Sequence, residues 1–158
     1  MVRLAGELLG THPLLTGLDR RQLDTLLHAG ELESWSAGEE VVRQGTLGDA
    51  MYLVLSGTVS VYMGDGARAL ATLGAGEFFG EMSMIEPAVR SATVRANDRL
   101  DLFRLPNVAV TRLFGDDPLL MSRILVHVVR ALSHRLRKTN ELVGSVESLS
   151  EWLAGSLL

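Results

Sequence analysis

The spacing of hydrophobic residues changes twice along the chain and divides it into three parts. In residues 1–30 leucines recur at helical intervals, with Asp19 placed to cap a helix and Gly30 placed to end it. Between residues 31 and 105, short apolar runs alternate with glycine turns every 8–12 residues, which is typical of an antiparallel sandwich or jelly roll. After residue 106 the apolar residues return to a helical spacing.

The middle part is expected to consist of short strands joined by glycine turns. Nine of the 16 glycines lie between Gly38 and Gly80, so the turns concentrate there. The sequence Gly64-Asp65-Gly66 is predicted to be a hairpin turn, because these residues tolerate positive φ. The expected strands are residues 41–42, 51–55, 59–63, 69–73, 92–94 and 100–103. The predicted fold class is α+β: an antiparallel β-roll or jelly roll, flanked by N-terminal helices and a long C-terminal helix.

The last helix carries an apolar stripe that predicts self-association. Asp116 or Asp117 caps its start, and Pro118 occupies a first-turn position. The stripe steps by four and three residues in alternation through Leu125, Val129, Leu132, Leu136, Thr139, Val143 and Val146. Such a heptad pattern is typical of coiled coils, so we expect a homodimer through Leu125, Val129, Leu132, Leu136 and Val143. Packing of this helix on its own β-domain is the alternative interpretation.

Gly144 is expected to weaken or end the long helix. The residues after it place Val146, Leu149, Leu153 and Leu157 on one face, as in a short amphipathic helix. The expected organisation is therefore a β-roll with N-terminal helices in residues 1–115, a dimerisation helix in 116–143 and a short helix in 144–158.

Composition narrows the classes of function. The 158 residues carry a net charge of −4, which argues against a default nucleic-acid binder. The absence of cysteine excludes disulfides, thiolate zinc sites, iron–sulfur clusters and cysteine nucleophiles. No apolar run approaches the roughly 18 residues of a membrane span. Glu7 interrupts the stretch that a signal peptide would need, so we expect a cytoplasmic protein with no membrane partner.

Signals of enzymatic activity are weak. A catalytic metal in a jelly roll needs histidine and carboxylate ligands on its strands, yet all four histidines lie outside residues 31–105. His127 and His134 share a helix face but stand roughly 10 Å apart at 1.5 Å per residue, too far for one ion. We therefore expect neither an enzyme nor a metal cofactor.

The segment 76–94 holds the pattern that points to a ligand. Gly80 lets the backbone approach a ligand closely, and residues 81–85 are expected to form a short helical turn whose N–H groups face an anion. Arg90 can return its guanidinium to the same place, which suits a phosphate diester. Because a carboxylate repels phosphate, Glu81 is expected to accept hydrogen bonds from a sugar hydroxyl. The alternative is a structural Glu81–Arg90 salt bridge inside a β-turn.

These residues resemble the phosphate-binding cassette of cyclic-nucleotide-binding domains. The resemblance rests on Phe79-Gly80-Glu81 with Arg90-Ser91-Ala92 and Val94. It also rests on the upstream run that contains Gly38-Glu39, Gln44-Gly45, Gly48-Asp49, Tyr52-Leu53-Val54 and Gly57-Thr58-Val59-Ser60-Val61. It covers about residues 12–145, nearly the whole chain. It implies that Glu81 binds the ribose 2′-hydroxyl and that Arg90 binds the cyclic phosphate.

Within that family the chain is similar to bacterial transcription factors of the cyclic AMP receptor (catabolite activator) type. This resemblance implies that Ser91 also touches the phosphate, that Thr139 contacts the adenine amino group and that Asn140 contacts adenine across the dimer. Asn140 stands where the family usually has serine, which leaves the base preference open because an amide both donates and accepts. Leu70 and Leu73 are the implied apolar wall of the pocket.

The expected function is a cyclic nucleotide sensor, with cyclic AMP as the first candidate ligand. The ligand-binding residues are Leu70, Leu73, Phe79, Gly80, Glu81, Met82, Ser83, Arg90, Ser91, Thr139 and Asn140. The regulators it resembles continue into a helix-turn-helix domain, whereas this chain stops at Leu158, so no direct DNA binding is expected. The alternatives are a β-roll scaffold that binds no nucleotide and a sensor for cyclic GMP or a cyclic dinucleotide. The downstream effector stays unknown.

Overall fold

The structure is a computed structural model that describes residues 2–64, 68–84 and 86–156. The chain forms two compact units, Met1–Ile124 and Leu125–Leu158. The first unit contains every strand and the shorter helices, and the second is the greater part of one long helix. Each unit is described by itself.

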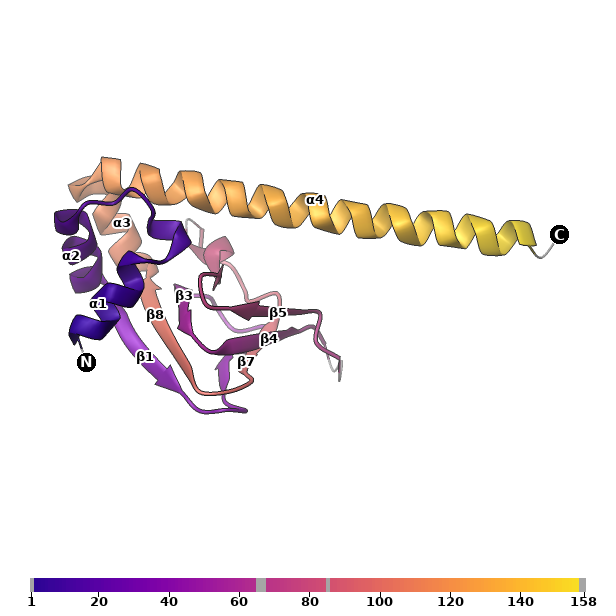
Figure 1. Cartoon of the computed structure of the whole chain (residues 1–158), viewed down its shortest axis with the longest axis horizontal. Coiled ribbons are helices and arrows are strands. Elements are labelled where there is room, and N and C mark those ends of the chain that lie inside the picture. The colour runs from indigo at the N-terminus through magenta and orange to yellow at the C-terminus, as the bar shows by residue number, and fades with distance from the viewer. Residues whose placement is uncertain (1, 65–67, 85, 157–158) are drawn as a thin grey trace. The chain divides into compact units, whose positions relative to one another are not determined.

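The N-terminal helices are α1 (Val2–Gly10), the 3-10 turn η1 (Pro13–Leu15) and α2 (Arg20–Ala29). The predicted cap of α2 is confirmed, because the Gln22 N–H donates to Asp19 Oδ1 over 2.8 Å and the Gln22 side chain accepts from the Asp19 N–H. Gly30 ends the helix, also as predicted. Figure 1 shows α1, α2 and α3 grouped at one end of the sheets.

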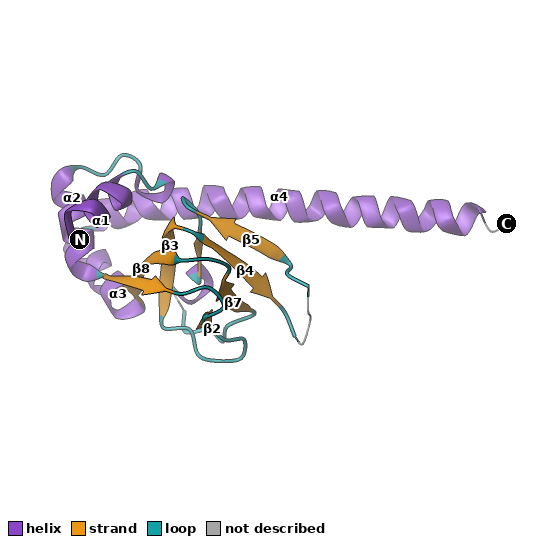
Figure 2. Cartoon of the chain, turned by 60° about the horizontal axis from the view of Figure 1, so that its bottom comes forward, coloured by secondary structure: helices purple, strands orange, loops and turns teal. Residues whose placement is uncertain are grey.

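The described residues form two four-stranded sheets from eight antiparallel strands, and Figure 2 shows how the strands lie. One sheet has the order β1-β8-β3-β6 and the other the order β2-β7-β4-β5. The strands are β1 (Glu31–Trp35), β2 (Glu40–Val42), β3 (Ala50–Ser56), β4 (Thr58–Tyr62), β5 (Ala71–Gly74), β6 (Phe78–Phe79), β7 (Thr93–Ala96) and β8 (Leu100–Pro106). The predicted β-roll with flanking helices is confirmed, and the six expected strands are all present. The structure adds β1 and β6, while Asp65 and Gly66 of the expected hairpin turn lie outside the described residues.

The core lies between the sheets and is centred on β3, which is buried along almost its whole length. Alternate residues of β3, Ala50, Tyr52 and Val54, join one hydrophobic cluster with residues of both sheets. The other members are Val59, Phe79, Val94, Ala96, Leu100 and Leu102. This packing holds β3 in place at the centre of the first unit.

Two helices follow β8. α3 (Asn107–Asp116) ends before Asp117, whose Oδ1 accepts the Leu120 N–H over 3.0 Å and so caps α4 (Pro118–Ser156) as predicted. The expected break at Gly144 is wrong, because α4 runs through it without interruption. Glycine costs only about 1 kcal/mol in a helix interior, and neither neighbour is a proline. Residues 144–156 therefore form no separate helix, and Leu157 lies outside the described residues.

Most of the expected apolar stripe is exposed, although Leu125 at its start is half-buried. Val129, Leu132, Leu136, Val143 and Val146 are exposed by 37% to 67%. Thr139 is exposed as well, and its hydroxyl donates to the Arg135 carbonyl one turn earlier. None of the helices in the described part of the chain is both long and apolar enough to cross a membrane.

Candidate functional site

The site is built around a sharp turn between β6 and β7. Gly80 adopts a left-handed conformation with φ of 81° and precedes the 3-10 turn η2 (Glu81–Ser83). A Cβ at Gly80 would stand 2.6 Å from Nη1 of Arg90 and 2.9 Å from the Ala50 carbonyl oxygen. Both the backbone conformation and this close approach require glycine.

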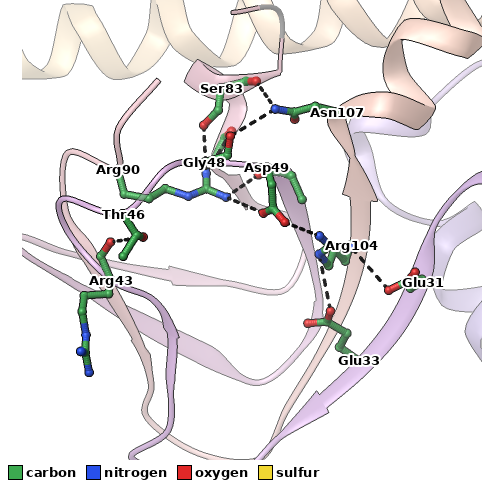
Figure 3. Close-up of polar contacts among 12 residues, drawn as sticks. Glu31, Glu33, Arg43, Thr46, Gly48, Asp49, Ser83, Arg90, Arg104 and Asn107 are labelled. Carbon is green, nitrogen blue, oxygen red and sulfur yellow. Dashed lines mark hydrogen bonds and ion pairs between the residues drawn. The ribbon is translucent and has the colours of Figure 1, made fainter. Parts of the chain in front are cut away.

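Arg90 returns to this turn and is buried there, with 8% of the residue exposed (Figure 3). Its Nη1 donates to Ser83 Oγ over 3.2 Å and to the Gly80 carbonyl over 3.4 Å. Its Nη2 donates to the Ala50 carbonyl over 2.7 Å. We call the residues around this guanidinium, Gly48, Asp49, Ala50, Gly80 and Ser83, the Arg90 cradle.

The charge of Arg90 is only weakly balanced inside the cradle. One carboxylate oxygen of Asp49 lies 3.9 Å from Nη2, and the Asp49 side chain is 66% exposed. The other Asp49 oxygen is 2.7 Å from Arg104, which also pairs with Glu31 and Glu33. Three hydrogen bonds hold the guanidinium in place, whereas the Asp49 carboxylate lies 3.9 Å away and also pairs with Arg104. Because this carboxylate neutralises the positive charge only in part, the cradle is suited to receive an anionic group beside Arg90.

The guanidinium of Arg90 lies near the ring of Tyr52, which is itself stacked on Phe79. Phe79 stacks on Tyr52 with ring centroids 5.0 Å apart, and the Arg90 guanidinium carbon lies 5.8 Å from the centre of the Tyr52 ring. Burial raises the pKa of the Tyr52 phenol, while its hydrogen bond with Arg104 opposes that shift. The phenol is therefore neutral at pH 7. Phe79 is a core residue, and it contributes to the site through Tyr52.

The remaining expected residues lie in different settings. Glu81 is half-buried at the start of η2, Met82 beside it is exposed, and Ser91 is exposed directly after Arg90. On the β5 side, Leu70 is exposed and Leu73 packs partly against the core. The structure thus brings Gly80, Glu81, Ser83 and Arg90 together. Thr139 and Asn140 belong to the second unit, and their part in the site stays a prediction.

Sequence reasoning assigned no binding role to several residues in and beside the cradle. Ala50 contributes its carbonyl, Asp49 its carboxylate, and Asn107 donates from α3 to the carbonyls of Ser83 and Gly48. The glycine–aspartate pair at 48–49 was visible as part of the family pattern. Its position beside Arg90 follows from strand pairing, which no local signal in the sequence shows.

No group of three His, Asp or Glu side chains that could hold a metal ion occurs among the described residues. The Arg90 guanidinium supplies the cradle with hydrogen-bond donors and a positive charge. Both are suited to holding an anion in place.

Comparison with known proteins agrees with this geometry. The family model described as "Cyclic nucleotide-binding domain" matches residues 32–117, which include the whole cradle. A cAMP-dependent protein kinase regulatory subunit of Schizosaccharomyces pombe is 36% identical over 110 residues, which cover 70% of this chain and 26% of that protein. The cyclic AMP receptor protein of Thermus thermophilus is 35% identical over 135 residues, which cover 81% of this chain and 59% of that protein. This chain therefore spans between a quarter and three fifths of the length of these curated relatives.

Solved structures show the same fold. A cyclic nucleotide-binding domain from Methylobacillus flagellatus superposes with a TM-score of 0.76 at 25% identity, and the match covers 89% of this chain and 80% of that one.

Proposed function

Because the chain belongs to the cyclic nucleotide-binding domain family, we propose that it is a regulatory module that binds cyclic AMP in the Arg90 cradle. One observation carries the proposal: a buried guanidinium faces carbonyl and hydroxyl groups, and its nearest carboxylate is exposed and shared with Arg104. A cyclic phosphate carries one negative charge and two free oxygens, and a guanidinium can bind both of these oxygens.

Different groups around Arg90 contact different parts of the ligand. The backbone of η2 and the Ser91 hydroxyl supply further donors for the phosphate, next to the left-handed Gly80. Glu81, at the first position of η2, accepts the ribose 2′-hydroxyl. The base lies toward the apolar side chains of Leu70, Leu73 and Met82. Such a division of contacts selects a nucleotide with a single phosphate charge over one with a charged triphosphate.

The long helix completes this proposal. Thr139 and Asn140 contact the adenine, and two chains associate through the exposed stripe of α4. The ligand then bridges the β-roll and the helix, and it shifts the protein toward the arrangement for which it has the higher affinity. That shift is the regulatory output, and this role needs no enzymatic chemistry in the chain.

Isothermal titration of the full chain with cyclic AMP tests the proposal. We expect one ligand per chain in the wild type and an affinity reduced by about tenfold or more in Arg90→Lys, because an ammonium keeps the charge but cannot bind two oxygens in one plane. Arg95→Lys is the matched control, since Arg95 is an exposed arginine on β7 that pairs with Glu40. Its affinity should equal that of the wild type.

Competition with cyclic GMP distinguishes the base. Displacement of cyclic AMP by an equal concentration of cyclic GMP would show that the site accepts either purine. If the folded wild-type protein binds neither nucleotide, the proposed function is wrong and a scaffold role takes its place.

A further inference from the structure

Asn107, the first residue of α3, joins separate parts of the Arg90 cradle (Figure 3). Its backbone N–H donates to the Asp49 carbonyl over 2.8 Å. Its Nδ2 donates to the Ser83 carbonyl over 2.6 Å and to the Gly48 carbonyl over 3.3 Å. One residue therefore connects the loop before β3 and the turn η2 to the start of a helix.

Ser83 is shared between Asn107 and Arg90. Its hydroxyl accepts Nη1 of Arg90 over 3.2 Å, while its carbonyl accepts Nδ2 of Asn107 over 2.6 Å. Ser83 is also packed closely against Gly48, because a Cβ built on Gly48 would collide with Ser83 Oγ. A movement of the guanidinium toward a bound anion thus acts on Ser83 through one bond and reaches α3 through the other.

The two ends of the Asn107 side-chain amide differ in their hydrogen bonding: Nδ2 donates two hydrogen bonds, and Oδ1 accepts none among the described residues. Within the described part of the chain, Oδ1 is buried and has no hydrogen-bond partner. Buried polar atoms are nearly always paired, and leaving one unpaired costs free energy. Rotating the amide by 180° would place Oδ1 against two carbonyl oxygens, so the orientation is determined by what Nδ2 donates to. The donor end is therefore the functional end.

We propose that Asn107 is a positioning residue of the nucleotide site. It holds η2 in the shape that receives the phosphate, and it transmits a shift of that turn to α3. This inference rests on the proposed function, since binding of the nucleotide at Arg90 causes the shift. α3 ends next to Asp117, which caps α4, so a movement of α3 acts directly on the start of the long helix.

The test is hydrogen exchange measured by mass spectrometry on the full chain, with and without saturating cyclic AMP. Asn107→Asp keeps the shape of the side chain and removes the donor. We expect faster exchange in the peptide that contains η2, whose Ser83 and Met84 amides bond to carbonyls within the turn. We also expect affinity for cyclic AMP to fall by about tenfold. Asn97→Asp, which adds the same charge at an exposed asparagine, is the matched control.

One readout separates transmission from a purely structural role. In the wild type and in Asn97→Asp, saturating cyclic AMP should slow exchange in α3, and in Asn107→Asp this protection should be lost although the site is filled. Equal protection of α3 in all three proteins would overturn the inference. If thermal melting shows that Asn107→Asp does not fold, Asn107→Ala replaces it.

The outcome is distinguishable from failure of the proposed function. If the wild type binds neither nucleotide, the proposed function is wrong, and with it the transmission of a ligand signal to α3. The ligand-free comparison still decides whether Asn107 holds η2: faster exchange than in Asn97→Asp supports this role, and unchanged exchange overturns it.

Discussion

Both ring nitrogens of His12 form hydrogen bonds inside the first unit. The Leu14 N–H donates to Nδ1 over 3.2 Å, so Nδ1 carries no proton, and Nε2 donates to the Glu77 carbonyl over 3.2 Å. The residue is 3% exposed. Burial lowers its pKa from the ordinary value of 6.5, and the hydrogen bond to Glu77 only partly opposes this. The fold therefore requires the neutral ring.

This requirement gives the protein a pH-dependent stability. Below pH 6.5 the unfolded chain protonates His12 before the folded chain does, so the free energy of unfolding should fall as pH is lowered from 7 toward the depressed pKa. Urea unfolding at a series of pH values measures the slope. His12→Gln should flatten it between pH 7 and 5.5, whereas His28→Gln, at an exposed histidine, should not. An unchanged slope in His12→Gln would contradict the assignment.

The surroundings of Gly48 leave no room for a side chain. A Cβ there would collide with Ser83 Oγ and stand 3.1 Å from the Ala88 carbonyl oxygen. Gly48→Ala should lower the free energy of unfolding by about 1–3 kcal/mol, and it should weaken nucleotide binding because Ser83 must move. Gly115→Ala, in a helix with open space around the added methyl group, should instead raise stability by about 0.5–1 kcal/mol. Thermal melting of both variants checks the contrast.

At the scale of secondary structure, local signals in the sequence were sufficient for most elements. Asp19 and Asp117 cap helices as predicted, because a cap depends on a few neighbouring residues. β1 was not predicted, because it lies at the edge of a sheet and has no regularly buried face. Its one leucine, Leu32, is exposed. β6 has only two residues, too few for any periodic pattern, and it exists through its pairing with β3.

The continuous α4 yields a prediction at the same scale. Gly144 lies in the helix interior, and an added Cβ would point into open space. Gly144→Ala should therefore stabilise this part of the helix by about 0.5–1 kcal/mol and raise helical content in circular dichroism on heating. Gly144→Pro should have the opposite effect, with a loss of helix after that position. A lower helical content in Gly144→Ala would show that the glycine has a packing role.

At the scale of the whole molecule, the site could be predicted only in part. Gly80, Glu81 and Arg90 follow from a local motif. Asp49, Ala50 and Asn107 meet them because β3 pairs with both β6 and β8, with Ala50 opposite Pro106 and Tyr52 opposite Phe79. This register brings residues 48–50, 80 and 107 to one end of β3, and it depends on packing between segments far apart in the sequence.

Self-association is the prediction that concerns the molecule as a whole. The stripe on α4 exposes Val129, Leu132, Leu136 and Val143, a pattern suited to a second copy of the same helix. Analytical ultracentrifugation at tens of micromolar protein should give twice the mass of one chain. Leu136→Glu should shift the mass toward that of a single chain, whereas Ser148→Glu, which adds the same charge away from the stripe, should not. A wild-type protein that sediments as a single chain would contradict the prediction.

The exposed stripe also has a consequence for how long the protein survives in a cell. A helix that leaves its apolar face uncovered opens readily, and an open helix is a substrate for proteases. The self-association predicted above would protect only those chains that find a partner, so the protected fraction would rise with the number of chains present. We therefore expect the half-life of the protein to increase with its own expression level, so that a small change in synthesis produces a larger change in the amount that persists.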